Sequence, residues 1–129
     1  MFEVTFPGGV AVDIAMNGHT IHTDQPTAIG GADSGPTPFQ LFLASIATCA
    51  GFYALRFCQE RHIPTEGLGV TMTTERDAAV PNKVTAIRLG VTTPAGFPEK
   101  YREAITRAID HCAVKRAIAE PPEFEVKVA

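Results

Sequence analysis

Three cysteines are the side chains of this sequence most able to do chemistry, because a thiolate is both a nucleophile and a redox-active group. They are Cys49, Cys58 and Cys112 in a chain of 129 residues. Cys49 lies in the stretch FLASIATCAGFYALRFC, which runs from Phe42 to Cys58 and carries one charged residue, Arg56. A free cysteine in such surroundings usually behaves as a small buried hydrophobe, so a reactive role and an inert role are both open at this point.

The spacing of the cysteines limits which of them can form a disulfide. Cys49 and Cys58 are nine residues apart, so in one helix they point to opposite sides and lie about 13–14 Å apart along the axis. A disulfide requires Cα atoms within about 7 Å, which excludes this pair. If Cys49 has a partner within the chain, that partner is Cys112. We expect Cys58, in the more polar last turns of its helix, to be inert.

Two predicted helices position these thiols. The first covers about residues 38–61, with Thr37 as N-cap and Pro38 at its first position. It is apolar nearly all round, which is typical of a helix buried on most sides. The second covers residues 97–112, and its apolar residues recur at helical spacing: Tyr101, Ala104, Ile105, Ala108, Ile109 and Cys112. Cys112 ends this stripe, so we expect it to face the core.

Strands are predicted for most of the remaining chain. Alternating apolar residues indicate strands at 2–6, 10–16 and 19–24, with the turn NG at 17–18, then a hairpin of 68–75 and 83–93, and a last strand within 121–129. A loop rich in Gly, Pro, Asp and Ser runs from Asp24 to Pro38, and loops of this length are often functional. The expected fold class is α+β, an antiparallel sheet with a long buried central helix and a second helix, in a single domain over residues 1–129.

Composition and charge exclude several partners. The net charge is −3 and the isoelectric point about 5.7, so we expect neither nucleic acid nor an anionic membrane surface as a partner. The apolar segment 39–57 approaches the length of a membrane span, but polar residues interrupt it, so we interpret it as a buried helix of a soluble protein. The N-terminus has no basic region typical of a signal peptide, and free cysteines then favour a reducing cytoplasm.

No metal site, cofactor site or hydrolase triad is predicted. His19 and His22 are three apart on a strand, so they should point to opposite faces. There is no CxxC or HExxH motif. Ser34 has no histidine at a recognisable spacing, and we expect Asp13 to be a charge on a strand face and Asp24 a turn residue.

Two cysteine-containing motifs together resemble those of the OsmC/Ohr superfamily of thiol-dependent proteins. The first is GPTPFQLFLASIATC, a proline-led apolar helix that ends in Cys49, and the second is DHCAVKRAI, which contains Cys112. The two cysteines are 63 residues apart, and the order of predicted elements also agrees with that family over nearly the whole chain.

The resemblance implies an OsmC-like fold and an intertwined homodimer with the thiols near its interface. It also implies a thiol-based redox protein for oxidative stress defence, acting as a peroxidase on small apolar hydroperoxides. In the mechanism that the resemblance implies, Cys49 attacks the hydroperoxide and becomes a sulfenic acid. Cys112 then reacts with this sulfenic acid to form a disulfide, which an external dithiol reduces.

The sequence departs from the peroxidase branch of that superfamily in the groups that stabilise the thiolate. That branch uses an arginine from the N-terminal region, held by a glutamate just after the helix-starting proline. Here Pro38 is followed by Phe39, and the first arginine in the chain is Arg56, so the sequence more closely resembles the OsmC-like branch that keeps both cysteines and lacks this arginine and glutamate. The substitutes that the sequence offers are Arg56, His111, Lys115 and Arg116.

Two functions of other classes stay open. One is a non-catalytic dimeric module that binds a lipid-like ligand in an apolar groove around Phe39, Phe42 and Phe52, with the cysteines as packing residues. The other is a structural or stress-associated dimer without a ligand.

Overall fold

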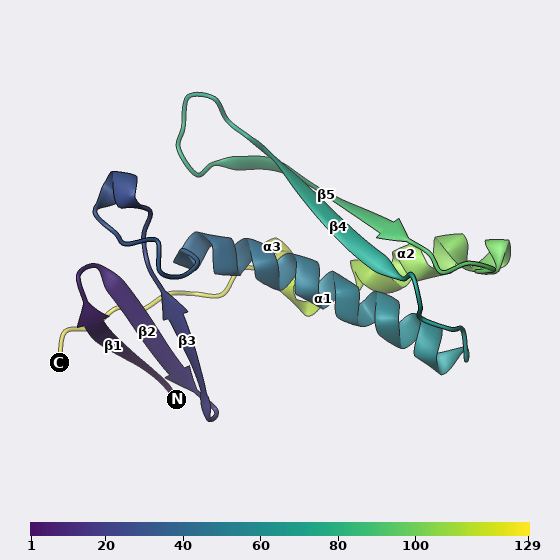
Figure 1. The fold of residues 1–129 in the computed structure, drawn as a ribbon, viewed down its shortest axis with the longest axis horizontal. Helices are drawn as coiled ribbons and strands as arrows, with labels where there is room; N and C mark the ends of the chain where they lie inside the picture. The colour runs from purple at the N-terminus through teal and green to yellow at the C-terminus, as the bar shows by residue number, and fades with distance from the viewer. The chain divides into compact units, whose positions relative to one another are not determined.

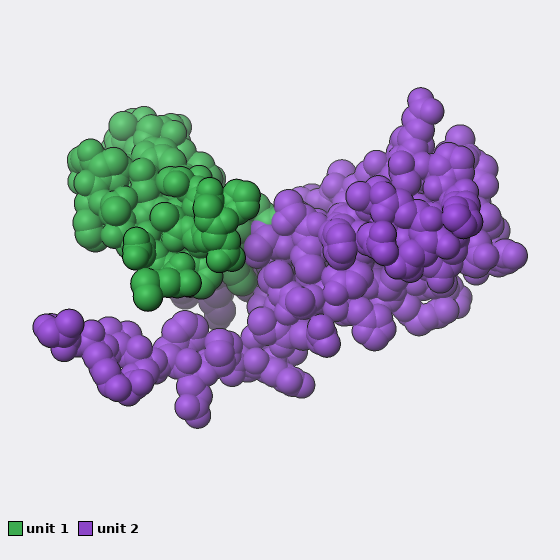
Figure 2. All heavy atoms as spheres, turned by 90° about the horizontal axis from the view of Figure 1, so that it is seen from below, with its two compact units in different colours: residues 1–44 green, residues 45–129 purple.

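The computed structural model describes all residues from Met1 to Ala129, in two compact units, Met1–Ala44 and Ser45–Ala129 (Figure 2). Figure 1 labels the helices and strands along the chain. Their order is β1 (Phe2–Gly8), β2 (Ala11–Met16), β3 (His19–Thr23), the 3-10 turn η1 (Thr27–Ile29), α1 (Pro38–Glu60), β4 (Gly69–Arg76), β5 (Val84–Thr92), the 3-10 turn η2 (Glu99–Tyr101), α2 (Arg102–Asp110) and α3 (Ala113–Ala119).

The first unit contains a three-stranded antiparallel sheet in the order β1-β2-β3. The predicted hairpin turn between β2 and β3 is confirmed, with φ of 49° at Asn17 and 80° at Gly18. Positive φ at both central residues is the requirement of a type I′ turn, which matches the twist of the strands. Met16 pairs with His19 on either side of this turn.

Asp24 organises the loop that follows β3. Its side chain is 3% exposed and accepts hydrogen bonds from the Ser34 hydroxyl (2.7 Å) and from the amides of Gln25 (2.7 Å), Ala32 (3.1 Å) and Ser34 (3.1 Å). The Ser34 hydroxyl bond and then these amide bonds hold the pKa of the Asp24 carboxyl well below its ordinary value. The residue that we expected to be an ordinary turn residue is therefore the anchor of the loop.

The helix α1 begins with the predicted cap. The amide of Gln40 donates to Thr37 Oγ1 (3.1 Å), and the amide of Thr37 donates to Gln40 Oε1 (2.9 Å). This reciprocal pair satisfies two amides at the helix start, as a capping box does. Pro38 fits the first position because its missing N–H would have no partner there.

The second unit has its core between α1, α2 and the β4–β5 hairpin. Ala50 and Ala54 of α1 are fully buried, and their small side chains let Ile105 and Ile109 of α2 pack closely. The apolar stripe predicted for the second helix is thus confirmed at its buried members. Cys58 also lies in this core and is fully buried, which corrects the polar surroundings that we expected. The reason is helical spacing, because position 58 is one turn beyond Ala54 on the buried face.

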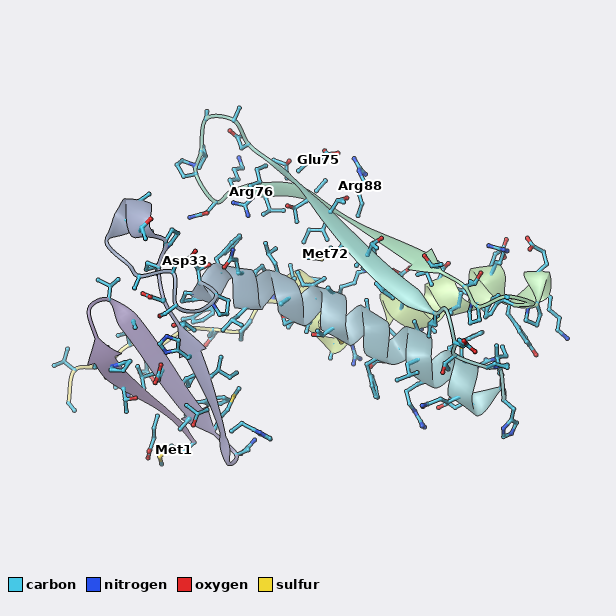
Figure 3. The ribbon with its side chains drawn as sticks, viewed as in Figure 1. Met1, Asp33, Met72, Glu75, Arg76 and Arg88 are labelled. Carbon is cyan, nitrogen blue, oxygen red and sulfur yellow. The ribbon has the colours of Figure 1, made fainter.

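The β4–β5 hairpin is antiparallel and twisted, with Gly69 opposite Thr92 and Arg76 opposite Val84. Figure 3 labels Glu75 and Arg88 on its outer part. There the Arg88 Nη2 donates to Glu75 Oε1 at 2.7 Å. The inner part carries the side chains that pack on the core, namely Leu68, Val70, Leu89 and Val91.

Three expectations differ from the structure. The strands form two separate sheets rather than one, and residues 121–129 form no strand, because no strand edge within the chain pairs with them. The long helix is also less buried than expected. By length and composition alone, α1 could cross a membrane, but the core helices of soluble proteins meet the same criterion. Only 33% of its most apolar 18-residue segment is buried inside the structure. Phe52, 55% exposed, marks the open face.

Candidate functional site

Two of the three thiols meet in the second unit. Cys49 projects from the middle of α1 and is half-buried, whereas Cys112 lies two residues after the end of α2, directly before α3, and is fully buried. The two side chains interact directly, and each shifts the pKa of the other. The structure therefore brings together the two cysteines singled out in the sequence and leaves Cys58 apart from them.

The surroundings of the two thiols differ in their effect on ionisation. Burial, and next the hydrogen bond to Cys112, raise the pKa of Cys49. Burial also acts to raise the pKa of Cys112, but the hydrogen bond from Cys49, the amides of Lys115 and Val114 and the Lys115 charge together lower it. The two thiols titrate as a pair, so a first negative charge is favoured on Cys112, with Cys49 donating its S–H to it.

Cys58 behaves differently from the pair. Burial raises its pKa, with Arg61 as a smaller opposing charge. Arg61 stacks over the Phe57 ring at 3.6 Å and donates to the Phe57 carbonyl. A buried thiol with a raised pKa is a poor nucleophile, as expected for a packing residue.

An apolar pocket of about 270 Å³ is lined by residues of α1, β5 and α3, and neither cysteine is among them. Ile46 lies one helical turn before Cys49, and Lys115 lies three residues after Cys112. The pocket has one charged lining residue, Lys115. Its lining residues are Ile46, Ile87, Leu89, Lys115, Ile118 and Ala119.

The sequence offers four charged or titratable side chains in place of the arginine that stabilises the thiolate in the peroxidase branch. These four side chains lie in different parts of the structure. Arg56 forms an ion pair with Glu60 at 3.2 Å. It lines a separate groove of about 460 Å³, to which His111 also belongs. Arg116 is exposed. Lys115 alone among them lines the apolar pocket, and its Nζ lies 2.5 Å from Oδ1 of Asp110.

A second cluster, in the first unit, was missed by the sequence analysis. His22 Nδ1 lies 2.5 Å from Asp13 Oδ1, and His22 Nε2 lies 2.8 Å from Ser34 Oγ. Asp13 pairs with His22 across β2 and β3, which only the strand register reveals. Because the Ser34 hydroxyl donates to Asp24, its proton is directed away from His22. The cluster therefore clamps the loop to the sheet and does not form the relay of a serine hydrolase.

Comparison with known proteins gives one family. Residues 31–127 match the family model described as OsmC-like protein. No curated protein matches the chain.

Solved structures of the same fold cover most of the chain. A protein of Psychrobacter arcticus, provisionally described as an osmotic stress induced and detoxification response protein, has a TM-score of 0.75 at 20% identity, covering 90% of this chain and 85% of its own. An organic hydroperoxide resistance protein of Legionella pneumophila has a TM-score of 0.57 at 21% identity, covering 92% and 87%. A protein of Vibrio cholerae, provisionally described as an organic hydroperoxide resistance protein and solved with captopril in one active site, has a TM-score of 0.58 at 20% identity, covering 94% and 85%.

Proposed function

This chain belongs to the OsmC-like family, and we propose that it is a thiol-dependent peroxidase that reduces organic hydroperoxides through Cys49 and Cys112. The observation that carries the proposal is the direct interaction of these two thiols in the second unit. Two interacting thiols are suited to a cycle in which one is oxidised and the other resolves it. The solved neighbours described as organic hydroperoxide resistance proteins support the substrate class.

The proposed cycle begins at Cys49, the more accessible thiol. As its sulfur attacks the O–O bond, the Cys112 thiolate accepts its proton. The distal oxygen is transferred to sulfur as a sulfenic acid, and the remaining alkoxide takes up a proton and leaves as an alcohol. The Cys112 thiol then displaces water from the sulfenic acid to form the disulfide. An external dithiol, available in a reducing cytoplasm, returns both thiols by two exchange steps.

The pocket supports an apolar substrate. Its walls are isoleucine, leucine and alanine side chains apart from Lys115, and its volume of about 270 Å³ suits a small organic group. Burial of such a group is favourable by roughly 25 cal/mol per Å² of apolar surface. Hydrogen peroxide gains nothing from these walls, so we expect organic hydroperoxides to be preferred.

We also propose that the functional unit is a homodimer. The most apolar helix of the chain leaves Phe52 and Leu55 exposed on one face. Residues 121–129 carry exposed apolar side chains with no strand partner within the chain. Exposed apolar surface of this kind is typical of an interface, and a second copy offers the same helix face to cover it.

A non-catalytic, ligand-binding role is the alternative, and the apolar pocket lined from α1, β5 and α3 is the observation that favours it. It predicts a bound apolar ligand, detectable by native mass spectrometry, and no hydroperoxide turnover. An assay of hydroperoxide turnover therefore distinguishes the two roles.

That assay is turnover of cumene hydroperoxide with dithiothreitol as reductant. We expect catalytic consumption by the wild type, and by Cys58→Ser, because Cys58 lies in the core and apart from the pair. Consumption no faster than that of dithiothreitol alone would overturn the peroxidase proposal. Much faster consumption of hydrogen peroxide than of cumene hydroperoxide would overturn the role given to the pocket.

A further inference from the structure

The hydrogen bonds around His22 acquire a direction once the proton of each group is assigned. The Ser34 hydroxyl donates to Asp24 Oδ2 at 2.7 Å. The Asp24 carboxyl accepts this bond and three amide bonds, an arrangement that favours its ionised form. Since a hydroxyl carries a single proton, the Ser34 oxygen can only accept from His22 Nε2, which lies 2.8 Å away. Nε2 of His22 therefore carries a proton.

The other ring nitrogen of His22 carries a proton as well. Nδ1 lies 2.5 Å from Oδ1 of Asp13, the residue directly opposite in the register of β2 and β3. An ionised carboxylate only accepts hydrogen bonds, so a bare Nδ1 would set two lone pairs against each other at this distance. A carboxyl ordinarily ionises at a lower pH than an imidazole, so the proton of this bond belongs to the ring. With both nitrogens donating, His22 is an imidazolium.

The composition of the first unit supports a charged His22. Residues 1–44 contain no lysine or arginine, so a histidine side chain is the only side chain there that can pair with a carboxylate as a cation. Thr5 of β1 pairs with Asp13, which places Glu3 on the same face of the sheet, two residues further along β1. The titratable groups around the ring are all carboxylates, namely Asp13 of β2, Asp24 and Asp33 of the loop and Glu3 of β1.

The imidazolium joins the loop that follows β3 to the sheet. It donates to Asp13 in the sheet and to Ser34 in the loop. Gly35 packs so closely on the ring that an added Cβ would lie 2.9 Å from His22 Cδ2. The His22 side chain is nevertheless 40% exposed, so the ring can exchange protons with water.

A neutral His22 cannot keep all of these hydrogen bonds. If Nδ1 loses its proton, its lone pair faces the Asp13 carboxylate. If Nε2 loses its proton, the ring needs the Ser34 hydroxyl as a donor, and that hydroxyl must then leave Asp24. Asp24 is 3% exposed, so water does not readily replace the lost bond. The second loss keeps the Nδ1–H bond to the carboxylate, and it is the one we expect.

We propose that His22 is a pH-sensitive latch, which as an imidazolium holds the loop of residues 24–38 against the sheet and loosens it when the ring loses a proton. This latch lies in the first unit and does not involve the thiols. The folded chain holds the protonated ring in two hydrogen bonds and the unfolded chain in none. The contribution of the latch to stability is therefore present at acidic pH and is lost as the pH rises and the ring loses its proton.

Two measurements on the wild type test the latch. The first follows the imidazole nitrogens of the ¹⁵N-labelled protein by nuclear magnetic resonance from about pH 5 to about pH 9, the range in which histidines change charge. We expect His22 to carry two protons at the acidic end and to keep the Nδ1 proton at the basic end. The second measures hydrogen exchange of the Ala32 and Ser34 amides, corrected for the intrinsic effect of pH. We expect their protection to fall roughly threefold to tenfold across this range, a limited change because the charge is partly exposed.

Two variants identify the group responsible for this change. Glutamine does not titrate, so His22→Gln should abolish the pH dependence of loop protection. His19→Gln is the matched control, because His19 is an exposed histidine on the same strand and on its other face. It should keep the wild-type pH dependence.

Three outcomes would overturn the proposal. They are a His22 ring that carries a single proton even at the acidic end, loop protection in the wild type that does not change with pH, and a pH dependence that survives in His22→Gln. The first two are measured on the wild type, so they decide the question even where a variant fails to fold.

Discussion

Cys49→Ser is expected to lower the rate of cumene hydroperoxide consumption by at least about a hundredfold. A serine hydroxyl does not ionise at neutral pH and cannot take up the peroxide oxygen as a sulfenic acid, so the first step has no substitute nucleophile. The rate is measured under the same dithiothreitol conditions as for the wild type, with Cys58→Ser as the matched control. Wild-type activity in Cys49→Ser would refute the mechanism.

Cys112→Ser separates the roles of the two thiols in the same experiment. We expect the sulfenic acid on Cys49 to persist, and to be trapped by dimedone, because no resolving thiol follows. We also expect a slower first step, because the thiolate that accepts the Cys49 proton is gone. Trapping on Cys112 in Cys49→Ser, with activity retained, would reverse the assignment of attacking and resolving thiol.

Phe52→Glu is expected to convert the proposed homodimer into a monomer. Phe52 is among the most exposed aromatic side chains of α1, and a carboxylate there would have to lose its hydration in the proposed interface. Loss of a central aromatic contact and burial of a charge together should weaken dimerisation by at least about a hundredfold. Sedimentation velocity should then give a mass near 13.8 kDa rather than twice that value.

Val80→Glu is the matched control for that substitution. Val80 is an exposed apolar residue at the tip of the β4–β5 hairpin, away from α1 in the chain, and receives the same acidic side chain. It should sediment with the wild type. A monomeric wild type, or a Phe52→Glu variant that stays dimeric, would contradict the interface.

Local patterns were sufficient to predict most secondary structure elements. Thr37, Pro38 and Gln40 form the helix start that their residue types require, and the NG turn adopts the positive φ angles that it needs. The stripe of α2 is buried at Ile105 and Ile109. These features depend on residues within a few positions of each other, which a sequence displays directly.

Features that depend on long-range pairing could not be predicted in the same way. Asp13, His22 and Ser34 meet only because the register of β2 and β3 and the folding of the loop bring them together. The last predicted strand has the right alternation, but a strand also needs a neighbouring edge, which sequence alternation does not supply.

The candidate site could be predicted in part from the sequence. Helical spacing excluded a bond between Cys49 and Cys58 and left Cys112 as the possible partner. Four side chains were equally available as substitute charges, and only the path of α3 places Lys115 in the pocket. The choice among them requires the tertiary structure, because all four lie within a few residues of a cysteine or on its helix.

The most direct test of the account treats the reduced wild-type protein with one equivalent of cumene hydroperoxide and maps its disulfides by peptide mass spectrometry over time. We predict one disulfide, between Cys49 and Cys112, formed much faster than free cysteine is oxidised, with Cys58 still reduced. Thiols that stay reduced, or that oxidise no faster than free cysteine, would contradict the proposed peroxidase.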